Sequence, residues 1–456
     1  MTKDFDSGGI ARVAGRLKGE LVLPGDAAYE QSRRVWNGAV DKHPAAIAYC
    51  LCISDVVASL CEAREANLPV SVRSGGHNVA GKAVVEGGLV IDLSRMKNRV
   101  IDERRRTILS DAGLTLAEFD GATQTLGLAT TMGVNGTTGI AGLTLGGGFG
   151  KLGRRFGLAC DNLIAAEVVT ADGQVLRASA GENADLFWGL RGGGGNFGIV
   201  TAFEYQLHPI GTEVVSGSIA FPWLRAREAV RLFWNFAVTA PDDLNIDGAL
   251  FTLDGERMFG ISVFHAGPTE RARRMLAPLL NGAEKLGAQP RLARLPYRQV
   301  QTGGDATFPK GRRYFWRAQF MRDLPDEAID VLLDHYPRAA SSDALMVFQQ
   351  VGGAIARVPV GATAYVNRDA QFDCFPVAIW DDPAEDAAHA AWVRDVCAAL
   401  APFSTGGVYV NNLGDEGPAR VRAAYGVNWT RLSELKAAYD PDNVFSGNQN
   451  IPAVRL

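Results

Sequence analysis

Hydrophobic residues between positions 30 and 95 follow first the period of a helix and then that of buried strands. Five residues recur at i, i+3, i+4, i+7 and i+8 and predict one apolar helical face: Ile53, Val56, Val57, Leu60 and Cys61. Short strand-like runs follow at 69–72 and 89–93. This order of elements is typical of a βαβ unit.

The pattern changes after Pro209, where the first domain is expected to close. Between residues 215 and 405, six strand-like stretches alternate with helical segments such as 225–238 and 325–337. The stretches are 217–221, 249–253, 258–264, 314–320, 345–350 and 371–380. We expect an antiparallel sheet with helices on one face, and therefore an α+β protein. The tail from 407 onward carries two further helical segments.

Two local signals place elements more sharply in the first domain. The pair Thr115 and Glu118 has the spacing of a capping box and predicts that a helix begins there. Residues 165–170 and the turn 171–173 predict a hairpin. The 52 glycines of this 456-residue chain are not spread evenly, and eight of them fall between residues 133 and 150. That tract has too few side chains to pack a core, but its backbone could lie against a flat aromatic ring.

Composition narrows the class of protein. A chain of 456 residues with 47% hydrophobic and 21% charged residues is expected to fold into two or three domains. The net charge of −4 gives no electrostatic case for nucleic acid or an anionic membrane. We expect neither a signal peptide nor a membrane span, and the six cysteines lack metal-site spacing. We therefore expect a cytoplasmic protein with reduced thiols and no bound metal.

Residues 193–198 match the string GxGxxG, but their context argues against a dinucleotide fold of the Rossmann type. That fold needs a strand before the glycines and a helix after them. Here a helical segment at 184–190 precedes the glycines and a strand at 199–205 follows. Gly150 and Lys151 are followed by leucine, so a Walker A loop is not expected either.

Two other glycine-rich loops are better candidates for a binding site. Residues 73–81 lie between two predicted strands, where consecutive backbone N–H groups can converge on an anion such as a diphosphate. Ser74 and Asn78 could donate to the same anion. The tract 133–150 could supply the flat surface. Each loop alone could be an ordinary tight turn, but the two together favour a binding site.

An ordered set of motifs carries a resemblance to a known family. The motifs are residues 73–77 (RSGGH), 139–150 (GIAGLTLGGGFG), 155–163 (RFGLACDNL), 190–201 (LRGGGGNFGIVT), 409–411 (YVN) and 448–452 (NQNIP). Together they resemble the vanillyl alcohol oxidase / p-cresol methylhydroxylase (PCMH) superfamily and, within it, the berberine bridge enzyme-like branch. The likeness covers most of 35–210 and 407–452. It implies a PCMH-type FAD-binding domain at 1–210, an inserted α/β substrate domain at 211–405, and a segment at 406–456 that returns to the first domain.

The resemblance also implies FAD as cofactor, held by a single covalent link through His77. A neutral imidazole is a suitable nucleophile toward the methyl group of an oxidised flavin, although a histidine that only hydrogen-bonds in its loop remains the alternative. The implied cofactor-binding residues are Arg73, Ser74, Gly75, Gly76, His77, Asn78, Gly81, Thr137, Thr138, Gly139, Gly142, Thr144, Gly147, Gly148, Gly198, Val200, Asn411, Asn448 and Asn450.

One position departs from many relatives, which attach the flavin a second time through a cysteine. Asn135 stands at that position and Cys160 lies in a different segment, so we expect one link. Thr138 falls where the family controls the access of dioxygen to the flavin. Its size is that of valine, which in the family is associated with oxidases.

The tail motif implies that Tyr409 is the catalytic base. A phenol needs a cationic or hydrogen-bonding neighbour to act as a base at neutral pH, and Arg368 is one candidate. Alternatively, Tyr409 is a core tyrosine, and Asn411 and Asn450 only stabilise turns. The substrate pocket is expected to be walled by residues of the central sheet: Tyr314, Trp316, Gln349, Asp373 and Phe375. Of these, Tyr314 and Trp316 share one face of their strand, and core packing is the alternative for this pair.

The leading hypothesis is an FAD-dependent oxidase that acts on a CH–OH or CH–NH group of a small organic substrate and is reoxidised by dioxygen. The alternatives are a flavin dehydrogenase with another electron acceptor, and a flavoprotein that catalyses a non-redox cyclisation or only binds a ligand. The sequence leaves open whether the substrate is a sugar, an aryl alcohol, an alkaloid or another amine. It also leaves the oligomeric state open.

Overall fold

The structure is a computed structural model, and it describes residues 7–454. Its first part is built on two sheets. A four-stranded sheet has the order β1 (Glu20–Val22), β2 (Ala46–Tyr49), β4 (Leu89–Asp92), β3 (Val70–Arg73), in which β2 and β3 run parallel to β4. The helix α3 (Ile53–Glu65) connects β2 to β3 and packs on α1 (Ser7–Arg16). The predicted βαβ unit is thereby confirmed.

The second sheet of this part has five antiparallel strands. Their order is β5 (Arg99–Asp102), β6 (Thr107–Asp111), β10 (Ile199–Gln206), β8 (Leu163–Val169), β9 (Val175–Ser179). The strands β8 and β9 form the predicted hairpin. Helix α7 (Ala184–Leu190) contacts β9 of this sheet. The same part contains three further short helices: α4 (Leu116–Thr123), α5 (Ile140–Leu145) and α6 (Gly153–Phe156). The remaining elements of this part are α2 (Tyr29–Arg33), β7 (Leu128–Ala129) and β11 (His208–Pro209).

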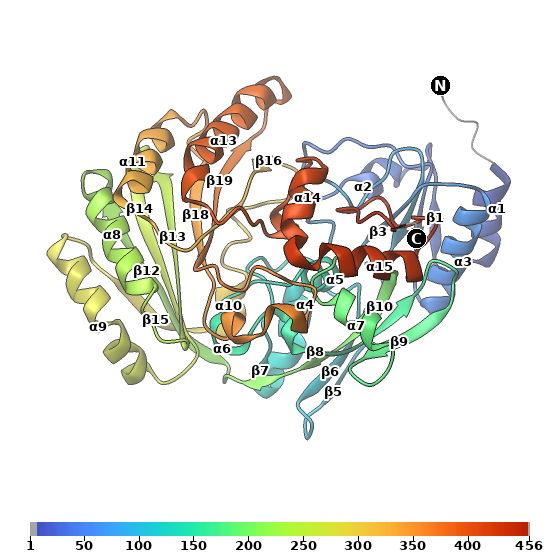
Figure 1. Ribbon diagram of the computed structural model, residues 1–456, viewed down its shortest axis with the longest axis horizontal. Helices are drawn as coiled ribbons and strands as arrows, with labels where there is room; N and C mark the ends of the chain where they lie inside the picture. The colour runs from blue at the N-terminus through green and yellow to red at the C-terminus, as the bar shows by residue number, and fades with distance from the viewer. Residues whose placement is uncertain (1–6, 455–456) are drawn as a thin grey trace.

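A large antiparallel sheet makes up the second part of the protein (Figure 1). Its order is β15 (Arg291–Pro296), β12 (Glu213–Pro222), β14 (Glu256–His265), β13 (Leu244–Leu253), β18 (Leu345–Gln350), β19 (Phe372–Trp380), β16 (Arg313–Trp316). The predicted strand 314–320 is interrupted at 317–318, and its second half, β17 (Gln319–Met321), also pairs with β19. The sequence does not predict the edge strand β15, because its two partly buried leucines, Leu292 and Leu295, are three residues apart, which is not the period of a strand.

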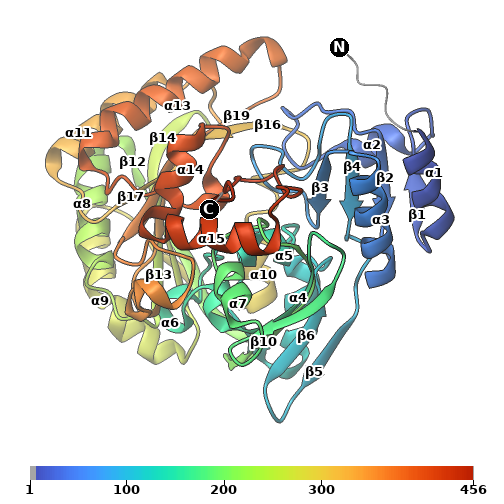
Figure 2. The ribbon, with the colours of Figure 1, turned by 45° about the vertical axis from the view of Figure 1, so that its right-hand side comes forward.

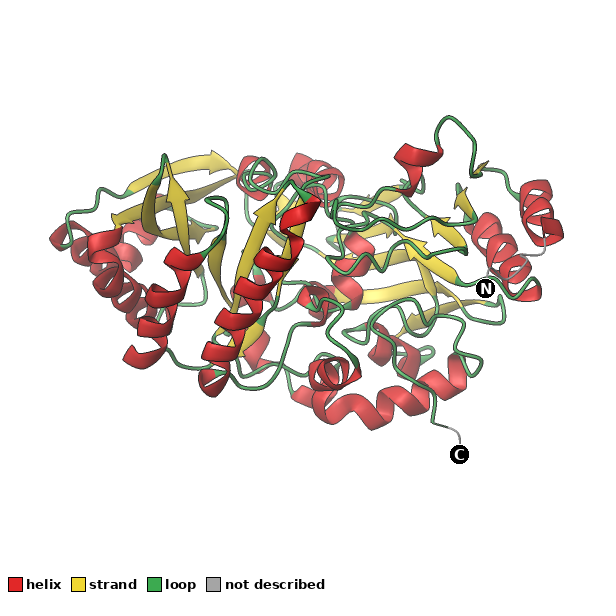
Figure 3. Cartoon of the chain, turned by 90° about the horizontal axis from the view of Figure 1, so that it is seen from above, coloured by secondary structure: helices red, strands yellow, loops and turns green. Residues whose placement is uncertain are grey.

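Four helices cover one face of this sheet, as predicted (Figure 3). They are α8 (Ala226–Ala237), α9 (Thr269–Lys285), α11 (Asp326–His335) and α13 (Asp386–Leu400). The buried side of α8 repeats at helical spacing through Ala226, Ala229, Val230 and Phe233, and it packs on alternate strand residues such as Phe348. The other strand residues therefore face the first part of the protein.

The C-terminal segment returns to the first part. Helix α15 (Trp429–Tyr439) contacts α7, and α14 (Pro418–Tyr425) precedes it (Figure 2). Two short helices, α10 (Tyr297–Gln301) and α12 (Ala354–Arg357), complete the described chain. The mixed fold with antiparallel sheets confirms the predicted α+β class. The exact domain boundaries at 210 and 405 stay a prediction.

Local signals in the first part are confirmed in detail, with one exception. The Thr115 hydroxyl accepts from the backbone N–H of Glu118, and the Glu118 side chain accepts from Thr115 N–H, which completes the capping box of α4. The glycine loop 193–198 follows α7 and precedes β10, the order that excludes a Rossmann site. The exception is the tract 133–150. It contains α5, whose Ile140, Ala141 and Leu145 belong to the core.

Within residues 7–454, no helix is both long and apolar enough to span a bilayer.

Candidate active site

A cavity of about 980 Å³ lies where the two parts of the protein and the C-terminal segment meet. The first part contributes the loops at 74–78, 133–145 and 194–200. The large sheet contributes residues of its uncovered face at 216–218, 347–349 and 375–377, and the tail contributes 409–412 and 445–449. Segments far apart in the sequence therefore build one site.

The loop that follows β3 has the backbone geometry of an anion site. Gly76 has φ +68°, a left-handed conformation that glycine adopts without strain. Within the described chain, the backbone N–H groups of Gly75, Gly76 and His77 donate no hydrogen bond. A Cβ on Gly75 would come within 2.2 Å of the backbone nitrogen of Gly139, so the two glycine loops touch directly. These unpaired donors beside a cavity are what a bound anion needs.

Most of the residues implied as cofactor-binding line this cavity. They are Ser74, Gly75, Gly76, His77, Asn78, Thr138, Gly139, Gly142, Gly198, Val200, Asn411 and Asn448, and Tyr409 lines it as well. The others lie behind the lining: Arg73, Gly81, Thr137, Thr144, Gly147, Gly148 and Asn450. Arg73 forms a buried ion pair with Asp92, and the Thr144 hydroxyl bonds that of Tyr205 at 2.8 Å. Such residues support the loops without reaching the cavity.

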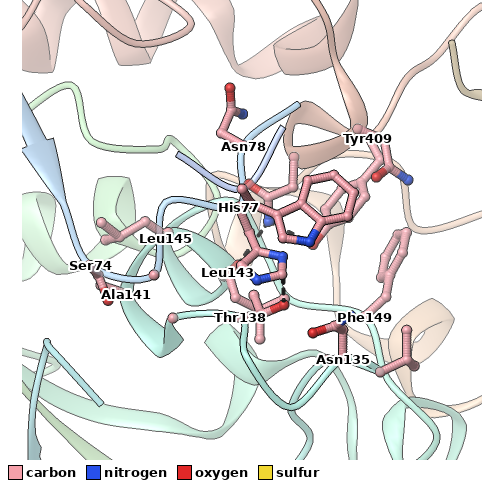
Figure 4. A pocket seen from close by; sticks show the side chains of 18 of the residues that line it. Ser74, His77, Asn78, Asn135, Thr138, Ala141, Leu143, Leu145, Phe149 and Tyr409 are labelled. Atoms are coloured by element: carbon pink, nitrogen blue, oxygen red, sulfur yellow. Dashed lines mark hydrogen bonds between the residues drawn. The ribbon is translucent and has the colours of Figure 1, made fainter. Parts of the chain in front are cut away.

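His77 is held between an aromatic ring and two threonines. Its imidazole stacks on Trp36 with ring centroids 5.1 Å apart. Nε2 lies 2.7 Å from Thr137 Oγ1, and Nδ1 lies 3.4 Å from Thr138 Oγ1, the side chain toward which the ring points in Figure 4. Burial, aided by the nearby cation of Lys310, lowers the pKa of His77 to about 4. The imidazole is therefore neutral at physiological pH.

Tyr409 lines the cavity, and its hydroxyl oxygen accepts two hydrogen bonds. The backbone N–H of Gly148 donates at 2.9 Å and the Asn411 amide at 2.8 Å, while the ring stacks on Phe149. Burial raises the pKa of the Tyr409 phenol, and the two donors lower it in part. Sequence reasoning named Arg368 as its possible neighbour. Arg368 instead pairs with Asp161 at 2.6 Å and lies over the ring of Tyr365.

Asp373 is a second ionisable group on the same side of the large sheet. It is paired across β18 and β19 with Gln349, which lines the cavity, so the two side chains leave the sheet on one face. Asp373 Oδ2 accepts from the amide of Asn412 at 2.7 Å, and Asn412 lines the cavity. Complete burial raises the pKa of Asp373 to about 7. The Asp373 carboxyl therefore does not line the cavity but is connected to it through Asn412.

Of the five wall residues expected from the sheet, three line the cavity: Trp316, Gln349 and Phe375. Tyr314 shares a face with Trp316 as predicted, but it stacks on Trp36 at 3.9 Å and donates its hydroxyl proton to the carbonyl of Pro309. Tyr314 therefore packs behind Trp36, which lines the cavity, and does not line the cavity itself.

Sequence reasoning missed several lining residues, among them Trp36, Lys82, Leu143, Phe149, Lys151, Asn196, Asn412, Tyr425 and Gln449. Asn196 lies inside the glycine loop 193–198 and Asn412 follows Asn411, so proximity to a motif could have indicated both. Trp36 has no such signal, because it approaches His77 through folding alone.

A buried carboxyl away from the cavity gives a pH-dependent stability. Asp120 on α4 has one oxygen without a partner among residues 7–454, and burial raises its pKa to about 7. Because the unfolded chain loses this proton near pH 4, the parent is expected to lose stability as the pH rises from about 4 to about 7. One pKa unit is worth about 1.4 kcal/mol. Asp120→Asn should therefore match the parent at pH 4 and exceed its unfolding free energy by up to ~4 kcal/mol at pH 8.

Denaturant unfolding at pH 4, 6 and 8 measures this difference. A gap between Asp120→Asn and the parent that stays constant across the three pH values would contradict the buried, protonated state of Asp120.

Comparison with known protein families matches both parts of the site. Residues 44–179 match the FAD binding domain family, and residues 408–452 match the berberine and berberine like family. An uncharacterised FAD-linked oxidoreductase of Bacillus subtilis, YgaK, is 31% identical over 96% of this chain and 98% of its own. The (R)-6-hydroxynicotine oxidase of Paenarthrobacter nicotinovorans is 30% identical over 95% of this chain and 97% of its own.

Solved structures show the same fold. The 6-hydroxy-D-nicotine oxidase from Arthrobacter nicotinovorans superimposes with a TM-score of 0.88 at 26% identity, over 95% of this chain and 98% of that one. BBE-like 1 of Physcomitrella patens reaches a TM-score of 0.91 at 22% identity, over 98% of this chain and 100% of that one. A whole-chain match of this kind extends to the large sheet, where the motifs are weakest.

Proposed function

Because the chain belongs to the berberine bridge enzyme-like FAD-linked oxidoreductases, we propose that it oxidises a CH–OH or CH–NH group of a small organic molecule with FAD bonded to His77. We further propose that dioxygen reoxidises the flavin. The observation that carries the proposal is the single cavity that joins the anion loop, His77 and the uncovered face of the large sheet. Its volume lies at the upper end of the ~300–1,000 Å³ that small-molecule sites occupy.

The residues present fit a flavin dinucleotide. The free N–H groups of residues 75–77 suit the diphosphate. No heavy atom lies within 4 Å of the position a Cβ would take on Gly142, which lines the cavity, so that backbone leaves room for a flat ring. Asn448 donates to the carbonyls of Gly195 and Phe445. Its buried Oδ1 has no partner in the described part of the chain and could accept from a ligand N–H or O–H. When bound, the flavin supplies the hydride acceptor.

We propose one covalent link to the flavin. Asn135 lines the cavity at the position of the relatives' second attachment, and an amide cannot form that bond. Cys160 is fully buried outside the cavity lining, and burial raises its thiol pKa well above the ordinary value. Mass analysis of flavin peptides is therefore expected to yield the segment around His77 alone. A second flavin peptide containing Cys160 would contradict this prediction.

The proton that leaves the substrate needs an acceptor, and the sequence motif assigns this role to Tyr409. Two N–H donors at its oxygen stabilise the phenolate form, which supports the role. Asp373 is the second candidate, favoured by one observation. Its pKa of about 7 lies near the operating pH, where acid–base catalysis is most efficient. Asn412 would connect this carboxyl to a substrate in the cavity.

The lining mixes aromatic side chains with amides, which suits a ring that carries polar substituents. Trp316 and Phe375 offer flat apolar surface, and Gln349 offers a hydrogen-bonding group beside them. Sugars, aryl alcohols and cyclic amines share this chemistry. The substrate class is therefore best found by screening all three for bleaching of the flavin.

The proposed function is tested by mixing the protein with candidate substrates in the absence of dioxygen and recording the flavin absorbance. A substrate of the oxidase is expected to bleach the flavin without dioxygen, and admission of air should restore the colour rapidly. If the flavin colour returns slowly in air but rapidly when a quinone or another electron carrier is added, the protein is a dehydrogenase and not an oxidase. A ligand that binds without bleaching under any condition would instead point to a non-redox role.

A further inference from the structure

A short chain of hydrogen bonds runs from His77 into the loop at 135–137. His77 Nε2 lies 2.7 Å from Thr137 Oγ1, and Thr137 Oγ1 lies 2.7 Å from Asn135 Oδ1. The backbone N–H of Thr137 also points to Asn135 Oδ1, at 3.1 Å. Asn135 and Thr137 therefore form a relay behind the imidazole.

The direction of every hydrogen bond in this relay follows from the backbone. The N–H of Thr137 can only donate, so the Asn135 atom that faces it is the carbonyl oxygen, which can only accept. The Thr137 hydroxyl must then donate its single proton to Asn135 Oδ1. Having no proton left for His77, the same hydroxyl oxygen accepts, and His77 Nε2 is the donor.

This fixes the tautomer of the neutral imidazole. A neutral histidine carries one ring proton, so a proton on Nε2 leaves the lone pair on Nδ1. The contact to Nδ1 is the long one, 3.4 Å from Thr138 Oγ1, so the lone pair is weakly engaged. Stacking on Trp36 holds the plane of the ring. His77 is thus presented with one nucleophilic nitrogen in a fixed orientation.

We propose that Asn135 and Thr137 are positioning residues for the covalent attachment of the flavin: they set the tautomer and the orientation of His77, so that Nδ1 is free to form the bond. The inference rests on the proposed His77 link and adds the residues that prepare the imidazole for it. Asn135 thereby has a role at the position where relatives place a second attachment residue.

Attachment joins the imidazole to the flavin and releases two protons and two electrons. A C–N bond forms between Nδ1 and the methyl carbon of the flavin's benzene ring, one methyl C–H proton leaves, and the proton on Nε2 leaves. Two electrons pass to the flavin ring and then to dioxygen, which with the two protons becomes hydrogen peroxide. Before it leaves, the Nε2 proton is hydrogen-bonded to Thr137 Oγ1, so the relay also stabilises the positive charge that develops on the imidazole.

The test compares Thr137→Val with Thr137→Ser in the full chain. Valine has the shape of threonine without the hydroxyl, whereas serine keeps it. Supporting partners of a functional histidine typically contribute about 10–100-fold, so Thr137→Val should take up flavin covalently about 10–100-fold more slowly after FAD is added. Thr137→Ser should keep most of the parental rate of covalent flavin uptake. Asn135→Leu should be slowed like Thr137→Val. Acid-precipitated flavin fluorescence over time measures the uptake.

A second readout separates a tautomer effect from a structural one. NMR of the isolated flavin peptide identifies the bonded nitrogen, which should be Nδ1 in the parent and a mixture of Nδ1 and Nε2 in Thr137→Val. The melting temperature of Thr137→Val should stay near the parental value. Parental attachment through Nε2, or a Thr137→Val protein that attaches flavin at the parental rate through Nδ1 alone, would overturn the inference and leave the His77 link intact. A parent without covalent flavin would overturn the link itself and the inference with it.

Discussion

Tyr409→Phe is expected to lower the anaerobic rate of flavin reduction by about 10²–10⁴-fold, the usual contribution of a positioned acid–base group. The phenol oxygen receives the N–H of Gly148 and the amide of Asn411, so a phenolate formed there is stabilised in place. Because burial raises the pKa of Tyr409, the parental rate should climb with pH, and the deficit of the variant should shrink when the substrate ionises by itself. Stopped-flow bleaching from pH 6 to 10 measures both effects.

The matched control is Tyr365→Phe. Tyr365 is buried in the same aromatic cluster, and its ring centroid lies 6.4 Å from that of Tyr409. Its hydroxyl has no partner within the described residues, and Tyr365 does not line the cavity. Its removal should leave the reduction rate nearly unchanged. Should Tyr409→Phe reduce its flavin as fast as the parent, the phenol is not the acceptor. Asp373→Asn then becomes the decisive variant, with a loss that follows a group of pKa about 7.

The second large effect is expected from His77→Ala, which should lose covalent flavin completely. The parent should be yellow and keep its colour in the acid-precipitated pellet, because the bond survives denaturation. In His77→Ala the colour should move to the supernatant as free FAD. The native variant should still bind FAD, because the N–H groups of the anion loop belong to the backbone and survive the substitution.

An exposed histidine provides the control for His77→Ala. His43 lies on the surface outside the cavity, so His43→Ala should keep its colour in the pellet. Free FAD released from the parent by acid would disprove the covalent bond directly. Equal covalent flavin in His77→Ala and the parent would place the attachment at another residue.

Local patterns in the sequence determined the elements of the fold. The capping box of Thr115 and Glu118 and the apolar face of α3 involve residues within one or two helical turns, so they are visible in the sequence itself. The order of helix, glycine loop and strand around 193–198 likewise excludes a Rossmann site on local pattern alone, and the fold has the same order. The interruption of the predicted strand at 317–318 was not visible in the sequence, because pairing with β19 decides where β16 ends and β17 begins.

The loops of the site were also visible, because glycine carries a conformational signal of its own. The residues 73–81 and 133–150 were identified from their glycines, and the structure brings Gly75 and Gly139 into contact. The partners of each chemical group were not visible. Trp36 reaches His77 across 41 positions, and Gly148 reaches Tyr409 across 261.

The sequence by itself therefore determined the fold class, the family and the loops, since these depend on spacing along the chain. The tertiary structure alone decided the chemical state of the key groups. Arg368 pairs with Asp161 instead of Tyr409, Asp373 acquires its pKa of about 7, and the tautomer of His77 is set by Thr137. Each of these depends on burial and on a partner that is remote in sequence, because desolvation and hydrogen bonding act through space and not along the backbone.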